Sequence, residues 1–145
     1  MIMVKIFIVS GAIGTNTLIA LRVKVKIHMN KRLIGKVGEL IASKYLTEKG
    51  YTIVCKNWTC RWGEIDLIAE KENILTFVEV KYRTNLTNGH PSEAITFYKK
   101  KSLQRSINMF LAKNYITKPW RVDVLCVNKL GKSLRVDYYE YVSLH

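Results

Sequence analysis

The sequence predicts an α/β domain with a mixed central sheet of about five strands flanked by helices. Three observations predict this class. Apolar residues recur at helical spacing in residues 31–49, apolar and charged residues alternate across residues 64–69 and 74–82, and a second strand pair fits residues 121–127 and 134–141. The resulting order of helix, three strands, helix and two strands is that of an α/β domain.

The first helix, over residues 31–49, has an apolar stripe at spacings of three and four, made by Leu33, Val37, Leu40, Ile41 and Tyr45. Gly50 stands where a C-terminal stop is expected. At 100° per residue, Glu39 lies off this stripe and shares a side with Gly35 and Ala42. Small residues there would admit another element, so we expect Glu39 to point into a cleft.

The segments that follow are predicted from alternation and turn residues. In order, they are a strand over 51–56, an aromatic loop over 57–63, a strand over 64–69, a turn at 71–73, a strand over 74–82 and a loop over 84–90. Pro91 then opens a helical region that reaches about Asn114, and the pattern leaves an interruption near Tyr98 open.

Residues 1–28 contain no acidic residue and run apolar from Ile2 to Val9, apart from Lys5, before a break at residues 10–11 and 14–16. The polar break that follows leaves no run of ~18 apolar residues, which argues against a membrane span. A signal peptide remains open, with Lys5 as its basic region, but no convincing cleavage site follows. The simplest interpretation is a natural start at Met29, with residues 1–28 as an extension outside the functional fold.

The charge balance indicates a polyanionic partner. Twenty-four Lys and Arg residues face 11 Asp and Glu residues, for a formal net charge of +13. Four of the basic residues lie in residues 1–28, so residues 29–145 still carry +9. Such an excess favours nucleic acid, because each neutralised phosphate releases condensed counterions. A basic surface that only maintains solubility is the alternative.

Three cysteines, Cys55, Cys60 and Cys126, include no C-x-x-C pair. This argues against both a zinc site and a disulfide framework. We expect reduced, packing cysteines in a reducing compartment, and therefore a cytoplasmic protein. We also expect no stable membrane association, because of the polar break in residues 1–28.

The third strand places Glu79 and Lys81 on one face, because residues two apart share a face. If the hairpin register brings Asp66 beside Glu79, two carboxylates and one ammonium group meet. Close carboxylates repel, and a divalent cation would hold both ionised. Oxygen ligands suit Mg²⁺ or Mn²⁺. The ordinary alternative is a solvated amphipathic strand with a cross-strand ion pair.

Five short motifs together resemble a known nuclease pattern. They are residues 35–39 (GKVGE), 57–58 (NW), 63–69 (GEIDLIA), 77–83 (FVEVKYR) and 121–124 (RVDV). The chain from Met29 onward is similar to the YraN-like family of uncharacterised bacterial proteins, of PD-(D/E)XK nuclease type, which resembles archaeal Holliday junction resolvases.

This resemblance implies a single nuclease-like domain over residues 29–145 with a restriction-endonuclease-like core. It implies that Asp66 and Glu79 are ligands of Mg²⁺ or Mn²⁺, that Lys81 is the catalytic lysine, and that Glu39 is an auxiliary helical carboxylate. For Asp123, a buried strand aspartate paired with Arg121 or a lysine is the simpler interpretation.

The expected function is a metal-dependent endonuclease that hydrolyses phosphodiester bonds in DNA, in preference to RNA, including branched or repair intermediates. The alternative is a non-catalytic nucleic-acid-binding protein that keeps the fold. A third hypothesis, an envelope protein anchored by residues 1–28, is disfavoured by the polar break. A homodimer is expected only by analogy with resolvases.

The expected nucleic-acid contacts are basic residues around the motifs and in the second helical region: Lys36, Arg61, Arg83, Lys99, Lys100, Lys101 and Arg105. Lys101 and Arg105 are four apart and share a helix face that could follow one phosphate strand. A solvated helix face is the alternative. Trp58 and Trp62 could stack on unpaired bases, although we expect at least one of them to pack within the protein.

Overall fold

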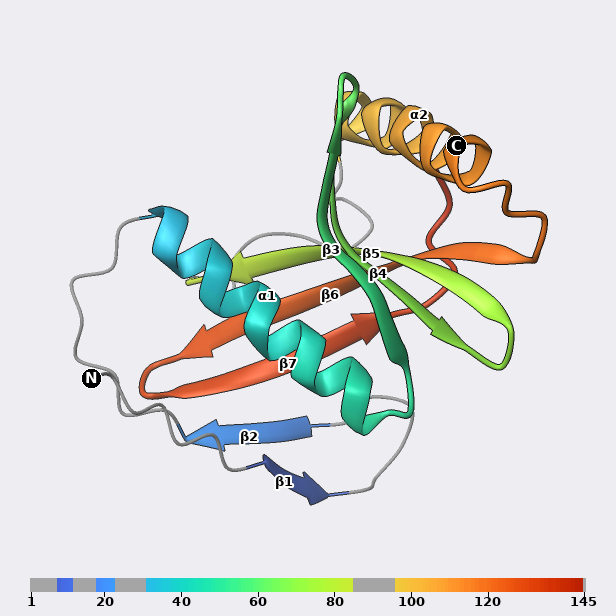
Figure 1. Ribbon diagram of the computed structural model, residues 1–145. Coiled ribbons are helices and arrows are strands. Elements are labelled where there is room, and N and C mark those ends of the chain that lie inside the picture. Colours follow the sequence, from blue (N-terminus) through green and yellow to red (C-terminus); the bar gives the residue numbers. More distant parts are fainter. Residues whose placement is uncertain (1–7, 12–17, 23–30, 85–95, 145) are drawn as a thin grey trace.

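The computed structural model describes residues 8–11, 18–22, 31–84 and 96–144. Within these residues lie two helices, α1 (Lys31–Glu48) and α2 (Phe97–Lys113). They accompany one sheet with the order β1-β2-β7-β6-β5-β4-β3 (Figure 1). Its strands are β1 (Ile8–Gly11), β2 (Leu18–Arg22), β3 (Thr52–Cys60), β4 (Gly63–Lys71), β5 (Ile74–Arg83), β6 (Trp120–Leu130) and β7 (Ser133–Tyr139).

The sheet is mixed because β5 and β6 run parallel while the other neighbours are antiparallel. The chain connects β5 to β6 through α2, as parallel strands require a crossover. The predicted α/β fold, with five mixed strands (β3 to β7) and two helices, is confirmed.

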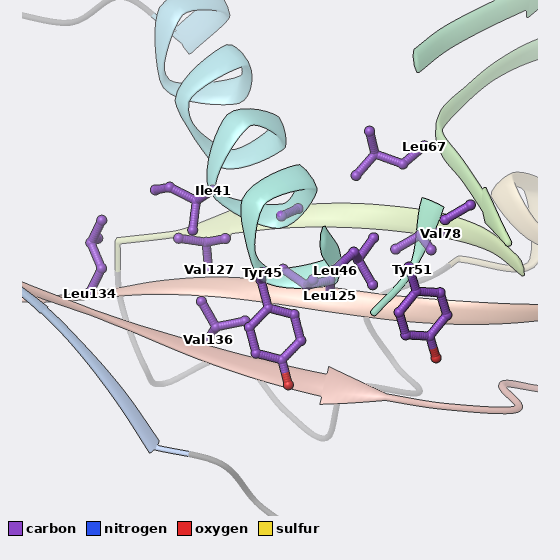
Figure 2. Packing of buried hydrophobic residues seen from close by; sticks show 12 residues of the cluster. Ile41, Tyr45, Leu46, Tyr51, Leu67, Val78, Leu125, Val127, Leu134 and Val136 are labelled. Atoms are coloured by element: carbon purple, nitrogen blue, oxygen red, sulfur yellow. The ribbon is translucent and has the colours of Figure 1, made fainter. Parts of the chain in front are cut away.

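The two helices cover opposite faces of the sheet. Val78 packs in the core cluster that contains the buried face of α1, whereas its neighbour Phe77 packs with α2. Successive strand residues point to opposite faces, so this alternation separates the two cores. Figure 2 shows the α1 side chains Ile41, Tyr45 and Leu46 gathered over the sheet.

The buried face of α1 keeps Ile41 and Tyr45 of the predicted stripe but differs from it at other positions. Leu33 and Leu40 are exposed, whereas Ala42 and Leu46, on the side shared with Glu39, are fully buried. The physical reason is a close approach at Gly38, where an added Cβ would lie 3.4 Å from the Tyr82 Cβ. The predicted stop at Gly50 is confirmed, with a φ of +84°.

The expected aromatic loop over residues 57–63 is wrong, because β3 continues to Cys60 and only the turn at Arg61 and Trp62 separates it from β4. This long hairpin docks on α2. The Ser102 hydroxyl donates a hydrogen bond to the Trp62 carbonyl, and a Cβ at Gly63 would lie 2.7 Å from the Ser102 oxygen. Glycine is therefore required at position 63, where φ is +142°.

The second helix, α2, begins at Phe97. Thr96 caps α2 by accepting a hydrogen bond from the Lys99 N–H, and no interruption occurs at Tyr98. The residues from Pro91 to position 95, and most of the loop predicted over 84–90, lie outside the described residues.

Two strands come from the N-terminal extension. β1 pairs with β2, and β2 pairs with β7 through Leu21 opposite Leu134 and Arg22 opposite Ser133. That residues 1–28 lie outside the functional fold stays a prediction. Neither α1 nor α2, the helices that the structure describes, is long and apolar enough to cross a membrane.

Candidate functional site

The candidate site lies where β4 and β5 separate. Their ladder ends at the pair of Leu67 with Val78, after which β4 pairs only with β3 and β5 only with β6. Asp66 and Glu79 are the next residues on each strand. The Asp66 Oδ2 accepts a hydrogen bond of 2.7 Å from the Val80 N–H, so a side chain takes the place of a ladder bond. The predicted register that brings Asp66 beside Glu79 is confirmed.

Glu79 is held between two ammonium groups. Its side chain is only 2% exposed, and its Oε1 lies 2.6 Å from the Lys81 Nζ. The Lys99 Nζ, from the first turn of α2, lies 3.2 Å from the Oε2. This second ion pair lacks hydrogen-bond geometry, and the buried Oε2 has no hydrogen-bond partner. The Oε2 therefore retains unused ligand capacity.

The electrostatics of the site are those of two crowded carboxylates. Burial and the neighbouring charge of Glu79 raise the pKa of Asp66 to about 7, while the Val80 N–H, Lys99 and Lys81 oppose the rise. The two lysines therefore do not fully offset burial and repulsion. An additional positive charge at this position would stabilise both ionised carboxylates.

Glu39 occupies the flank of α1 and is half-buried. A Cβ added at the preceding Gly38 would lie 3.7 Å from Val80 and 3.4 Å from Tyr82, so α1 crosses β5 beside the Glu79–Lys81 segment but on the other face of the sheet. Within the part of the chain that the structure describes, no three His, Cys, Asp or Glu side chains gather as a metal-holding group. The role of Glu39 in the site stays a prediction.

Lys99 is the site residue whose place the sequence reasoning missed. The sequence places it in a basic run with Lys100 and Lys101, whereas in the structure its ammonium group pairs with Glu79. The signal was present in the spacing. Lys99 precedes the buried Leu103 by four residues, and Ser106 and Phe110 continue that inward face.

The other predicted nucleic-acid residues lie on several elements. Lys36, Arg61, Lys101 and Arg105 are exposed, while Arg83 and Lys100 are half-buried. Arg61 and Arg105 both approach the exposed Trp62 ring, with guanidinium carbons 4.9 and 4.7 Å from its centroid. Trp58 instead packs edge-on against Phe110 at 5.3 Å, which confirms that one of the two tryptophans packs within the protein.

The predicted structural pairing of Asp123 is confirmed. This fully buried carboxylate accepts hydrogen bonds from the Arg121 Nε at 3.2 Å, the Tyr138 hydroxyl and the Tyr141 N–H. Arg121 also pairs with Glu140 at 2.6 Å. The three cysteines are free thiols, as predicted.

Comparison with known proteins places the site within a family pattern. The sequence pattern described as "Uncharacterised protein family UPF0102" matches residues 38–127, which include Asp66, Glu79, Lys81 and Lys99. The chain belongs to the UPF0102 family. This membership confirms the predicted YraN-like relationship.

Several UPF0102 proteins match most of this chain. The relative from Lachnoclostridium phytofermentans is 43% identical over 103 residues, which cover 70% of this chain and 87% of the relative. The relative from Carboxydothermus hydrogenoformans is 35% identical over 116 residues, covering 79% and 98%. A third, from Caldanaerobacter subterraneus, is 48% identical over 84 residues, covering 58% and 69%.

Proposed function

We propose that this UPF0102 protein is a metal-dependent endonuclease that hydrolyses phosphodiester bonds in DNA, including branched or repair intermediates. The observation that carries the proposal is the pair of carboxylates, Asp66 and Glu79, where β4 and β5 separate. Lys81 and Lys99 both form ion pairs with Glu79. Close carboxylates with adjacent cations suit the binding of a divalent ion together with a phosphate.

The residues fit a hard divalent cation. Asp66 and Glu79 offer only oxygen ligands, and the Glu79 Oε2 is buried without a hydrogen-bond partner. These two side chains would hold Mg²⁺ or Mn²⁺, with Glu39 as the proposed auxiliary carboxylate. When bound, such an ion supplies Lewis-acid stabilisation of negative charge and a more acidic water.

The chain itself would orient and neutralise the phosphate. The Val80 N–H fixes one oxygen of Asp66, whose negative charge interacts with that of Glu79. Lys81 and Lys99 are positioned by Glu79, and their ammonium groups can pair with phosphate oxygens when that carboxylate is occupied elsewhere. Fixed cations at this point would stabilise charge that develops during hydrolysis.

A non-catalytic nucleic-acid-binding protein is the second candidate. It is favoured by the neutralisation of Glu79 by two lysines and by the lack of a three-ligand group among the described residues. In that case the ion pairs would be structural, and the basic surface alone would carry the function.

A cleavage assay on the full chain separates the two candidates. Duplex, single-stranded and four-way-junction DNA are incubated with Mg²⁺ or Mn²⁺ and, separately, with EDTA. The matched variants are Lys81→Ala and Lys113→Ala, since Lys113 lies on the exposed far end of α2. The endonuclease predicts cutting that EDTA and Lys81→Ala abolish and Lys113→Ala preserves. Binding without cutting on every substrate would favour the second candidate, and cutting that survives Lys81→Ala would refute the assignment.

A further inference from the structure

Aromatic and cationic side chains gather where the β3–β4 turn meets the N-terminal half of α2. We call this set the aromatic–cation surface, and it consists of Arg61, Trp62, Phe97, Tyr98, Lys101 and Arg105. Figure 1 shows the tip of the β3–β4 hairpin beside the start of α2. The Ser102 hydroxyl, bonded to the Trp62 carbonyl, fixes the turn to the helix.

The contacts within the surface form two groups, which are related by the helical spacing of Lys101 and Arg105. The Lys101 Nζ lies 5.1 Å from the Phe97 ring, and the Phe97 and Tyr98 rings are 5.9 Å apart. Arg105, one helical turn beyond Lys101, reaches the Trp62 ring at 4.7 Å. Rings and cations therefore alternate across α2 onto the hairpin turn.

The cations of this surface lack acidic partners among the described residues. Arg61, Lys101 and Arg105 form no ion pair there, whereas Lys118 and Arg135 pair with carboxylates elsewhere on the sheet. Arg61 and Arg105 share one ring and repel each other across it. A bound polyanion would relieve this repulsion.

The aromatic rings of this surface are unusually exposed to solvent for large apolar side chains. Tyr98 is 83% exposed, Phe97 66% and Trp62 38%. Cations alone suffice for contact with duplex phosphates. Exposed rings interleaved with cations are instead typical of surfaces for single strands, because only unpaired bases offer a face to stack on.

We propose that the aromatic–cation surface binds unpaired nucleotides, so that the substrate of the Asp66–Glu79 site has a single-stranded segment beside the cleaved bond. The aromatic–cation surface adjoins the site along the chain, because Tyr98 directly precedes Lys99, whose ammonium group pairs with Glu79. This statement about substrate class rests on the proposed nuclease function, whereas the binding of unpaired nucleotides can be measured without cleavage.

The test is a binding titration of the full chain in EDTA, read by fluorescence anisotropy. The labelled probes are oligo-dT, oligo-U and a mixed-sequence DNA duplex of equal length. The double variant Phe97→Ala/Tyr98→Ala removes two open rings, and Tyr115→Ala is the matched control, an exposed tyrosine just beyond the other end of α2.

We expect the double variant to weaken binding of oligo-dT by about 10-fold or more, from the loss of base stacking. Its affinity for duplex should change less than about twofold, because phosphate contacts remain. The change Arg105→Gln should weaken binding of all three probes. Similar losses on oligo-U and oligo-dT would indicate a surface for both kinds of single strand, and a loss confined to oligo-dT a surface selective for DNA.

Two results would overturn the proposal. One is an equal loss of single-strand and duplex affinity in the double variant, and the other is a single-strand affinity no lower than that of Tyr115→Ala. A failure of cleavage with retained stacking-dependent binding would instead count against the proposed nuclease alone. Circular dichroism of each variant verifies that the binding change does not reflect unfolding.

Discussion

Asp123 on β6 and Glu79 on β5 are both buried in the same sheet, yet their oxygens are satisfied to different degrees. Asp123 accepts hydrogen bonds on both oxygens, from Arg121, the Tyr138 hydroxyl and the Tyr141 N–H. Glu79 has one oxygen bonded to Lys81 and a second without a hydrogen-bond partner.

The groups around the two carboxylates also differ in whether they offset the cost of burying a negative charge. Burial raises the pKa of Asp123, but the Tyr138 hydroxyl, the Tyr141 N–H and Arg121 oppose that rise, and Arg121 binds Glu140 as well. Around Glu79, the carboxylate of Asp66 adds repulsion. A buried carboxylate whose oxygens all have hydrogen-bond partners stabilises the fold. A buried carboxylate with one oxygen left without such a partner can accept a ligand.

The largest expected effect is a difference in the free energy of unfolding between variants of Asp123 and Glu79. Asp123→Ala should lower the free energy of unfolding by about 3–5 kcal/mol, because it removes the buried acceptor shared by Arg121, the Tyr138 hydroxyl and the Tyr141 N–H. Glu79→Gln should lower it by much less, because the amide removes the repulsion with Asp66. Urea denaturation measures both. Equal losses would show that the two clusters are alike in role.

The second effect is a loss of DNA cleavage that is expected for a variant of Glu79 but not for a variant of a control carboxylate. If the proposed nuclease is correct, Glu79→Gln should reduce the rate of metal-dependent DNA cleavage by on the order of 100-fold or more. Glu70→Gln is the matched control, because Glu70 lies on β4 and pairs with Lys118 away from the site. Comparable cleavage by the Glu79 and Glu70 variants would remove Glu79 from the mechanism.

The third effect is a pH dependence of stability at Asp66. A folded pKa near 7, above the value of about 4 in the unfolded chain, means that the contribution of this group is favourable below pH 4 and is lost as the pH rises through 7. In metal-free protein, Asp66→Asn should therefore be more stable than wild type at pH 8, by about 1–2 kcal/mol after allowance for solvent screening.

Thermal or urea unfolding of the two proteins at pH 4 and pH 8 measures this difference. The Asn side chain can still accept the Val80 N–H, so the backbone contact is matched. A stability difference that is independent of pH would contradict the raised pKa of Asp66.

The smallest effects are expected at Lys99, where one substitution should raise the affinity for metal and lower the affinity for DNA. Lys99→Met should raise the affinity of the site for Mn²⁺ about twofold to fivefold, because a competing cation of a partly exposed pair is removed. The same change should weaken duplex DNA binding and reduce the slope of log affinity against log salt by about 0.9. Calorimetry and salt titrations measure the two. Weakened affinity for both ligands would indicate that Lys99 is only structural.

The sequence predicted the carboxylate pair because the hairpin fixes its own register. Glu72 and Asn73 both have positive φ at the tight turn, and the alternation on each strand then sets Asp66 beside Glu79. The contribution of Lys99 was not predicted, because its contact with Glu79 depends on how α2 docks across the sheet.

The errors in local structure have the same tertiary origin. Leu33 and Leu40 are exposed because the close approach at Gly38 rotates another side of α1 toward the sheet. The segment predicted as a loop after Lys56 is strand because the hairpin extends to meet α2, where Gly63 and Ser102 are in contact. Neither effect is encoded in periodicity alone.

A calorimetric titration of the full chain with Mn²⁺ at pH 7.5 tests directly whether Asp66 and Glu79 form a divalent-cation site. The titration is run on wild type, Glu79→Gln and Glu70→Gln, so that a site carboxylate is compared with a carboxylate of the same sheet outside it. We expect saturable binding to wild type and to Glu70→Gln, and its loss in Glu79→Gln. Equal binding by all three proteins, or no saturable binding by wild type, would contradict a divalent-cation site at Asp66 and Glu79.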